Sequence, residues 1–351
     1  MLKTARLAAA AAVDRMVHGV ALSRSESSRK RSAAESLGPQ ERMATLRAVA
    51  AFYDERADAI FPAPTRASVA VVAEQTLSDG GRRIDLRFSS EHRTLHPEVR
   101  ERFDGDARNA EARARLFVGP GGPRPAILLF HGYLGGDPRL EEELFSVRFL
   151  RSRGLDVALC VLPFHGARGK LGRPRFPASD PRFTIEGFRQ AVLDARSVIA
   201  HLRTVHGTTA FGAMGMSLGG YTTALLATVA PELSFAVPMI PLASIADFAE
   251  KDGRYVGTAS QQREQHEALE RAFASVSPLV RAPLVPPAGR LVIAAEADGI
   301  TPIGHARKIA AHWQSELVIF PGGHLLQLGR RQAFARVMRM LEAMALIPAR
   351  R

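Results

Sequence analysis

The sequence is poor in several features that mark large classes of protein. Its 351 residues include a single cysteine, Cys160, which excludes an intramolecular disulfide framework and argues against a zinc site built from cysteines. It has no run near the roughly 18 consecutive apolar residues that a membrane-spanning helix requires, and no internal repeat. Hydrophobic residues nevertheless make up 46% of the chain, enough for a globular protein with one large core.

Positive charge, in contrast, is plentiful. The chain has 47 lysines and arginines against 35 acidic residues, a net charge of +12, and such an excess can favour nucleic acid or an anionic membrane. Here the basic residues are spread along the whole chain and mixed with acids, as in ARNAEARARL (107–116). No nucleic-acid-binding module and no basic stripe interleaved with aromatics is visible. We therefore interpret the charge as an arginine-rich surface and expect no nucleic-acid partner.

The first 60 residues form a part of their own. Residues 1–23 begin basic and contain an alanine run, like a targeting segment, but Asp14, Arg15 and His18 interrupt the apolar stretch. We expect an amphipathic helix that packs on the body or touches a membrane peripherally. Residues 23–36 are polar and charged, typical of a flexible linker, and a second helix follows. The expected location is cytoplasmic, with peripheral membrane attachment or export as alternatives.

Residues 61–351 show the pattern of an α/β domain. Two strands are expected around the turn at residues 79–81, and a second pair around the Gly/Pro turn near residues 119–125. From there, short apolar strands alternate with amphipathic helices, including single helices over 141–154 and 185–207. This rhythm predicts a mostly parallel, twisted sheet with helices on both faces and antiparallel strands at its N-terminal edge. Residues 244–289 interrupt the alternation, as a small helical cap insertion would.

A lone serine stands between two glycines where one predicted strand meets the next helix. The stretch is Gly215-Met216-Ser217-Leu218-Gly219. A tight strand-to-helix turn strains the serine backbone and pushes its Oγ out of the sheet, and larger side chains two residues away would collide. The helix N-terminus also directs backbone N–H groups towards a developing oxyanion. A Gly-rich close contact between helix and strand is the simpler alternative, so the context of the motif decides.

The loop after the first parallel strand supplies part of that context. The segment FHGYLGG (130–136) can bring a backbone N–H, that of Tyr133, towards the N–H of Leu218. Two such donors form an oxyanion hole. An ordinary turn at the end of a strand is the alternative.

Two further strand ends carry an acid and a histidine. Asp298 follows a hydrophobic strand in AEADGITP, and His324 follows the last strand in PGGH. A carboxylate there can hold a histidine Nδ1–H, and the histidine can act as general base on Ser217. Glu296 is the competing acid; Asp298 is favoured because it lies in the loop. A loop aspartate with no role remains the alternative.

Together these motifs resemble the α/β-hydrolase superfamily over roughly residues 110–346, with the chain order serine, acid, histidine. The resemblance matches Ser217 to the nucleophile, Asp298 to the acid and His324 to the base. It implies two-step acyl transfer by an esterase or lipase-like carboxylic ester hydrolase. The expected substrate is a small-molecule ester or a lipid-like ester, and neither a metal nor an organic cofactor is needed.

Substrate and reaction details stay open at this stage. Side chains near the expected site could contact substrate, and so could the basic loop 163–177 unless it is merely solvated. A peptidase or amidase, an acyltransferase, or a non-catalytic binding module would use the same scaffold. Neither acyl length nor oligomeric state can be read from the chain. The candidate substrate contacts are His131, Leu134, Met216, His165 and Arg168.

Overall fold

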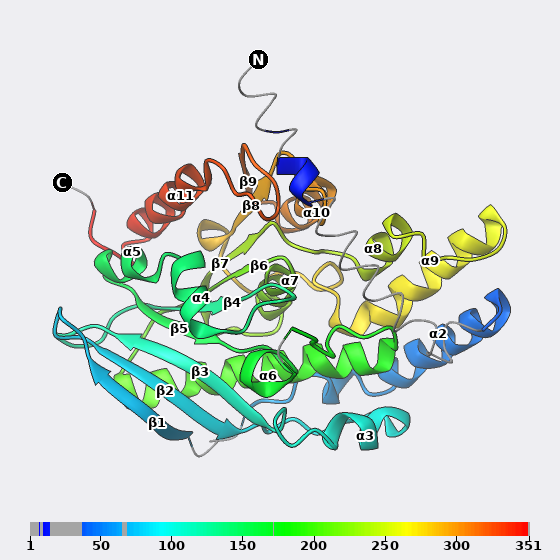
Figure 1. The fold of residues 1–351 in the computed structure, drawn as a ribbon, viewed down its shortest axis with the longest axis horizontal. Helices are drawn as coiled ribbons and strands as arrows, with labels where there is room; N and C mark the ends of the chain where they lie inside the picture. The colour runs from blue at the N-terminus through cyan, green and yellow to red at the C-terminus, as the bar shows by residue number, and fades with distance from the viewer. Residues whose placement is uncertain (1–6, 8–9, 15–36, 65–68, 171, 350–351) are drawn as a thin grey trace.

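A nine-stranded sheet forms the centre of the protein. The computed structural model describes residues 7, 10–14, 37–64, 69–170 and 172–349. Within these, the strands lie in the order β1-β2-β3-β5-β4-β6-β7-β8-β9 (Figure 1). Their bounds are β1 (Val69–Thr76), β2 (Arg82–Ser89), β3 (Glu111–Val118), β4 (Ala126–Phe130), β5 (Asp156–Cys160), β6 (Phe211–Met216), β7 (Leu233–Met239), β8 (Leu291–Ala295) and β9 (Glu316–Phe320).

The strands divide into an antiparallel edge and a parallel body. β1, β2 and β3 pair antiparallel, and so do β3 and β5, whereas all pairs from β5 through β4 to β9 are parallel. The hairpin expected around residues 79–81 is confirmed. The second pair is wrong, because β5 lies between β3 and β4. Residues 119–125 exceed the roughly two to five residues of a hairpin loop, which leaves room for β5 to enter between them.

Helices cover both faces of the sheet, as expected. Successive strand residues point to opposite faces, so Leu128 and Leu129 of β4 belong to two separate apolar clusters. The cluster containing Leu128 includes residues of α6, α7 and α10, and the other includes residues of α5 and α11. The helices are α2 (Pro39–Asp54), α3 (Pro97–Asp104), α4 (Pro138–Leu144), α5 (Val147–Ser152), α6 (Pro181–His206), α7 (Leu218–Leu226), α8 (Ile245–Lys251), α9 (Ala259–Phe273), α10 (Ile303–Trp313) and α11 (Arg330–Ala343).

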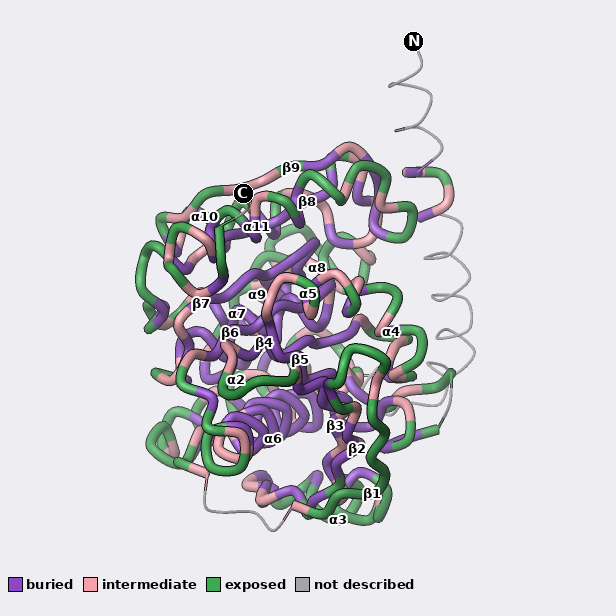
Figure 2. Tube along the Cα trace, turned by 90° about the vertical axis from the view of Figure 1, so that its left-hand side faces the viewer, coloured by how far each residue is buried: buried purple, intermediate pink, exposed green. Residues whose placement is uncertain are grey.

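Helix α6 is the long helix expected near residues 185–207, and it is buried along most of its length (Figure 2). The single helix expected over 141–154 is wrong. It is divided into α4 and α5 at Ser146, which adopts a left-handed conformation with φ 52°. The turn lets α4 stay beside the loop that follows β4, while Val147 and Leu150 of α5 pack under the sheet.

The insertion at 244–289 carries α8 and α9, and α9 packs against α2. Tyr53 of α2 is buried, and its hydroxyl donates a 2.8 Å hydrogen bond to Glu186 on α6. The division of the chain at residue 60 stays a prediction. Of the expected N-terminal helix, residues 10–14 are described and helical, whereas the polar linker at 23–36 lies outside the described residues.

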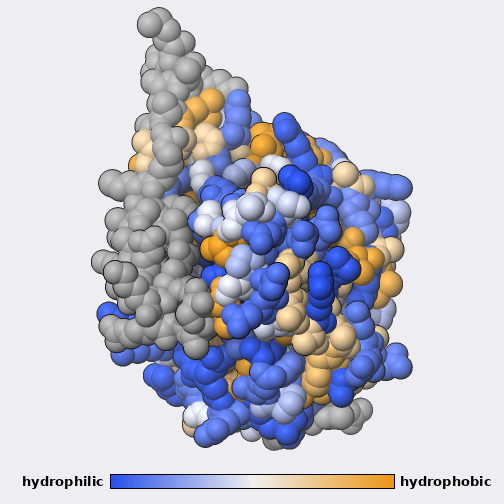
Figure 3. Space-filling view, turned by 90° about the vertical axis from the view of Figure 1, so that its right-hand side faces the viewer, coloured by the Kyte–Doolittle hydropathy of each residue, from blue (hydrophilic) through white to orange (hydrophobic). Residues whose placement is uncertain are grey.

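The face of α2 and α9 is mixed in hydropathy over the described residues that are visible there. Hydrophilic residues spread over that face and are interrupted by smaller apolar patches (Figure 3). No helix in the described part of the chain combines the length and the apolarity that crossing a bilayer demands.

Candidate active site

Ser217 lies at the sharp turn between β6 and α7. Its backbone adopts φ 57° and ψ −113°, a strained conformation for a residue other than glycine, which confirms the tight turn predicted from the sequence. A side chain on Gly215 would collide with the carbonyl of Gly219, and a side chain on Gly219 would collide with the carbonyl of Phe130. Glycine is required at 215 because α7 packs against the end of β6, and at 219 because α7 packs onto the end of β4.

The two predicted N–H donors lie on segments that flank this serine. Leu218 is the first residue of α7, and the first N–H groups of a helix have no partner within the helix. On the other side, a Cβ added to Gly132 would lie 3.7 Å from the Ser217 Cβ, so the loop 131–136 passes beside the serine. Tyr133 and Leu134 of this loop are 42% and 62% exposed, and the substrate contact expected of Leu134 stays a prediction.

His131 supports this loop from inside. Its Nε2 accepts a 3.0 Å hydrogen bond from the backbone N–H of Leu162, so the proton sits on Nδ1, which donates to the Gly132 carbonyl at 2.8 Å. Burial lowers the pKa of His131 to about 3, which keeps the ring neutral. The expectation that His131 contacts substrate is therefore wrong: the ring is 2% exposed and both its nitrogens are bonded to the backbone.

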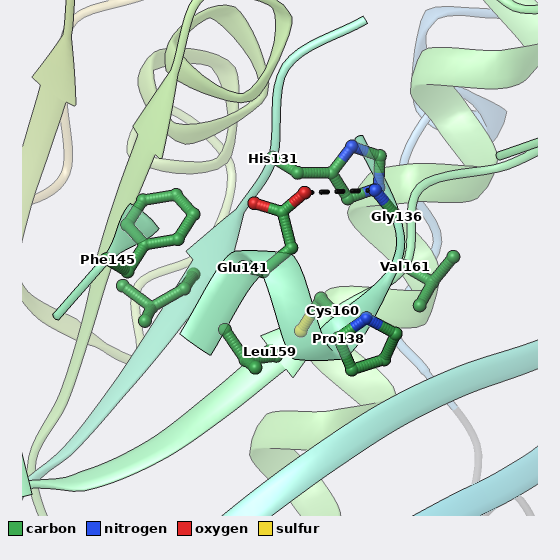
Figure 4. A pocket seen from close by; sticks show the side chains of 9 residues that line it. His131, Gly136, Pro138, Glu141, Phe145, Leu159, Cys160 and Val161 are labelled. Atoms are coloured by element: carbon green, nitrogen blue, oxygen red, sulfur yellow. Dashed lines mark hydrogen bonds between the residues drawn. The ribbon is translucent and has the colours of Figure 1, made fainter. Parts of the chain in front are cut away.

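The far end of the loop is tied to helix α4. Glu141 accepts a 3.1 Å hydrogen bond from the N–H of Gly136, and both residues line a small pocket shared with His131 and Cys160 (Figure 4). Burial raises the pKa of Glu141 to about 7 and that of the Cys160 thiol to about 12. The thiol is packed inside a strand, as the sequence predicted, and is protonated at neutral pH.

The acid and the histidine meet at the ends of β8 and β9. Asp298 Oδ2 and His324 Nδ1 lie 2.8 Å apart, and the two residues are 9% and 8% exposed. Glu296, the competing acid, follows β8 directly and is exposed. A carboxylate bonded to Nδ1 fixes the proton there and leaves Nε2 as an acceptor, so the geometry selects Asp298 as the partner of His324.

Thr301, which sequence reasoning missed, completes the acid loop. The backbone N–H groups of Ile300 and Thr301 donate to Asp298 Oδ1 at 2.9 and 2.7 Å. The Thr301 hydroxyl lies 3.1 Å from Asp298 Oδ2 and 3.0 Å from the Ile240 carbonyl, which follows β7. The signal was present in the sequence as DGIT, because an aspartate often accepts from N–H groups two and three residues ahead.

Hydrogen bonds connect Ser217 and the acid loop through the turn that follows β7, the strand between β6 and β8. The N–H of Ser217 donates to the Met239 carbonyl at 3.1 Å, and its own carbonyl accepts from Leu242 at 3.2 Å. The same turn after β7 holds Thr301. On the histidine side, the Gln327 amide donates to the His324 carbonyl at 3.0 Å and lies 3.8 Å from the sulfur of Met216.

Met216 itself is 7% exposed at the end of β6, so only a small part of its side chain faces the site. Among the described residues, no hydrogen bond joins Ser217 Oγ to His324.

In the basic loop after β5, Arg168 and His165 were expected as substrate contacts, and the burial of both contradicts this expectation. Arg168 is 1% exposed and forms an ion pair of 2.8 Å with Asp194, so it is neither a substrate contact nor a solvated side chain. His165 is also 1% exposed, and its Nδ1 lies 2.8 Å from the Pro163 carbonyl. Burial lowers its pKa to about 4. A guanidinium and an imidazole buried this deeply hold the loop together and do not reach a substrate.

Only one group of residues in the described part of the chain has the spacing of a metal site. Asp247, His266 and Glu270 place ligand atoms within 4.8 Å of one another. The ammonium of Lys308 already pairs with Asp247, and the hydroxyl of Ser244 already donates to Glu270. Each carboxylate therefore has a partner without a metal ion, and we do not interpret the cluster as a metal centre.

The sequence of the chain is similar to that of two curated proteins. No model of a known protein family matches the chain. Two uncharacterized proteins of Mycobacterium tuberculosis, from strains CDC 1551 and H37Rv, are each 33% identical over 237 residues, covering 65% of this chain and 56% of the relative. The match thus spans little more than half the length of these curated relatives.

Three solved structures with a similar fold are named esterases. Acetyl xylan esterase 1 of Thermoanaerobacterium sp. has a TM-score of 0.57 at 16% identity, over 82% of this chain and 92% of that chain. The acetyl xylan esterase of Paenibacillus sp. R4 has a TM-score of 0.55 at 16% identity, with the same coverage. An esterase from an Arctic intertidal metagenomic library has a TM-score of 0.52 at 14% identity, over 78% and 97% of the two chains. At these identities the similarity establishes the fold.

Proposed function

Because the chain has the α/β-hydrolase fold, we propose that it is a serine hydrolase that cleaves carboxylic esters through an acyl-serine intermediate. The observation that carries the proposal is the 2.8 Å contact between His324 Nδ1 and Asp298 Oδ2; Thr301 of the acid loop is bonded to the turn after β7 that also bonds the backbone of Ser217. A buried acid–histidine pair and a half-buried serine at the strand ends are the groups that acyl transfer requires.

In the first step, His324 Nε2 takes the proton of Ser217 Oγ while the oxygen attacks the ester carbonyl carbon. Asp298 holds the imidazole orientation and stabilises the imidazolium. The negative charge on the carbonyl oxygen is stabilised by the N–H groups of Leu218 and Tyr133. The imidazolium then protonates the leaving alcohol, whose C–O bond breaks, and the acyl group stays on Ser217.

In the second step, His324 takes a proton from water, and the hydroxide oxygen attacks the acyl carbon. Collapse of this second intermediate returns the proton to Ser217 Oγ and releases the carboxylic acid. The hydrogen bond between Ser217 and His324 forms in this proposal when substrate binds, since such catalytic bonds often tighten only in the substrate complex.

Acetyl esters are the first substrates to test. Two of the similar structures are named acetyl xylan esterases, and a sugar-borne acetyl group and a short synthetic acetyl ester share the same reacting carbonyl. Longer acyl chains then measure how much room the site offers beyond Ser217.

The experiment is labelling with a fluorophosphonate probe, with p-nitrophenyl acetate and octanoate assayed in parallel. Wild type should label and turn over at least one ester, and Ser217→Ala should do neither. Ser260→Ala, an exposed serine on α9, is the matched control and should behave as wild type. A folded wild type that does not label would favour a binding module.

Two other reactions of the same triad are outcomes of this assay. Turnover of p-nitroanilide substrates faster than of the matched esters would make the protein an amidase or peptidase. Transfer of the acyl group to an added alcohol, detected as a new ester, would make it an acyltransferase.

A further inference from the structure

The N-terminal segment reaches the loops of Asp298 and His324 from 285 to 311 residues away in sequence. Figure 1 shows the dark-blue segment that contains residues 10–14 beside β8, β9 and α10. Asp14 and Ala10 of this segment are 0% exposed. One side of the segment is therefore buried against the loops that follow β8 and β9, while Ala12 is exposed.

The carboxylate of Asp14 bridges these two loops. Its Oδ2 accepts hydrogen bonds from the backbone N–H groups of Gly299 at 3.1 Å and His324 at 2.6 Å. Its Oδ1 accepts from the N–H of Leu325 at 3.0 Å. A buried carboxylate is stable only where hydrogen bonds replace its hydration, and here the backbone of the acid loop and that of the histidine loop supply them.

Two glycines make room for this contact, and each is next to a residue of the pair. A Cβ added to Gly299 would lie 3.1 Å from the Cβ of Asp14, and one added to Gly323 would lie 2.6 Å from its Oδ2. Gly299 follows Asp298, and Gly323 precedes His324. The glycines allow the segment 10–14 to approach both loops more closely than any side chain would permit.

We propose that Asp14 is a positioning residue that holds the loop of the acid and the loop of the base in one fixed arrangement. The inference rests on the proposed function of Ser217, Asp298 and His324. Catalytic groups work only when held within about 0.5 Å of their productive geometry, and loops alone do not hold that tolerance. One carboxylate bonded to His324 itself and to the neighbour of Asp298 restrains both partners of the 2.8 Å contact.

The test compares Asp14→Asn with wild type in the full chain. Asparagine keeps the size of the side chain but replaces one acceptor oxygen by an N–H₂ group that cannot accept from an N–H. Asp58→Asn is the matched control, because Asp58 is exposed and lies just after α2. Asp14→Glu is the second variant, since it retains both acceptor oxygens on a longer stem.

The first readout needs no turnover: hydrogen–deuterium exchange of the peptides that cover residues 298–301 and 322–327. We expect exchange in these two peptides to accelerate at least 10-fold in Asp14→Asn, with the peptides of β4 and α6 unchanged. The second readout is ester hydrolysis, in which kcat should fall 10-fold to 100-fold while KM stays within about 3-fold. Asp58→Asn should match wild type in both, and Asp14→Glu should recover part of kcat.

Unchanged exchange in both peptides would overturn the proposal, and so would faster exchange with an unchanged kcat. Acceleration throughout the protein, with kcat and KM lost together, would mean that Asp14 only supports the fold. If wild type hydrolyses none of the esters, the proposed function fails while the exchange data still show whether Asp14 holds the two loops.

Discussion

His324 Nδ1 lies 2.8 Å from Asp298 Oδ2, although the two side chains come from loops after different strands. Neither loop makes this contact by itself. The Thr301 hydroxyl and the backbone N–H groups of residues 300 and 301 orient the carboxylate from one side. The proposed chemistry depends on this contact, so the first predictions concern the groups that form it.

Replacing Asp298 should abolish the proposed ester hydrolysis without unfolding the protein. Asp298→Asn removes the charge that stabilises the imidazolium and presents an N–H₂ group to Nδ1, which favours the wrong tautomer. Replacing a triad aspartate by asparagine costs on the order of 10⁴-fold in kcat. Glu296→Gln, which changes the exposed acid two residues earlier, should stay within about 3-fold of wild type. Equal losses of kcat in the two variants would contradict the assignment of Asp298 as the acid of the triad.

Thr301→Val should weaken the contact between Asp298 and His324 by removing a hydroxyl that helps to orient the Asp298 carboxylate. The change keeps the shape of the side chain but deletes a buried hydroxyl that lies within hydrogen-bond distance of Asp298 Oδ2 and of the Ile240 carbonyl. An unmade hydrogen bond of this kind costs about 1–3 kcal/mol, so thermal unfolding should shift to lower temperature and kcat should fall roughly 10-fold. Thr301→Ser retains the hydroxyl and should recover most of kcat; a serine variant as impaired as valine would contradict this reading.

Gly219→Ala should be strongly destabilising. The new methyl group would collide with the carbonyl of Phe130, and forcing extra atoms into a packed site costs about 1–3 kcal/mol. Gly304→Ala on α10 is the control, since a Cβ there meets nothing within 4 Å and alanine favours a helix by about 0.5–1 kcal/mol. In chemical denaturation, the midpoint should therefore fall for Gly219→Ala and rise for Gly304→Ala. A tolerated Gly219→Ala would mean that the turn can open away from β4.

The stability of the loop beside Ser217 should depend on pH through Glu141. Burial raises the pKa of Glu141 from 4.5 to about 7, so the folded state binds a proton more tightly than the unfolded state, and stability falls as pH rises from about 4.5 to about 7. Glu141→Gln removes this dependence. The shift corresponds to about 3 kcal/mol.

Thermal unfolding at pH 5 and pH 8 measures the effect. The gain in Tm of Glu141→Gln over wild type should be larger at pH 8, by a few degrees. Glu143→Gln, an exposed acid on the same helix, should show no such gain. An equal difference at both pH values would place the titration elsewhere.

Arg168→Met tests whether this arginine supports the fold or binds substrate. Removing it leaves Asp194 buried without its 2.8 Å ion-pair partner, which typically costs about 3–5 kcal/mol. Tm should drop clearly, while the ratio of KM values for anionic and neutral esters stays as in wild type. Arg173→Met, in the exposed part of the same loop, should leave Tm unchanged. A changed KM ratio with unchanged Tm would restore Arg168 as a substrate contact.

The sequence by itself determined the alternation of strands and helices and the need for glycine at 215 and 219. The alternation depends on a local rule, because apolar spacing decides which face is buried. The glycines were indicated by the motif around Ser217, whereas the Phe130 carbonyl that excludes a Cβ at 219 was identified only by the fold. The order serine, acid, histidine along the chain was also visible, and each residue was found at the strand end where it was expected.

Only the tertiary structure decided contacts between segments distant in sequence. It inserted β5 between β3 and β4, buried Arg168 against Asp194, made His131 a support for the loop, and joined His324 to Asp298 rather than to Glu296. Nothing around Asp14 in the sequence indicates that its carboxylate binds backbone N–H groups 285 to 311 residues away. Backbone donors carry no residue identity, so such a contact leaves no motif and exists only once the chain has folded.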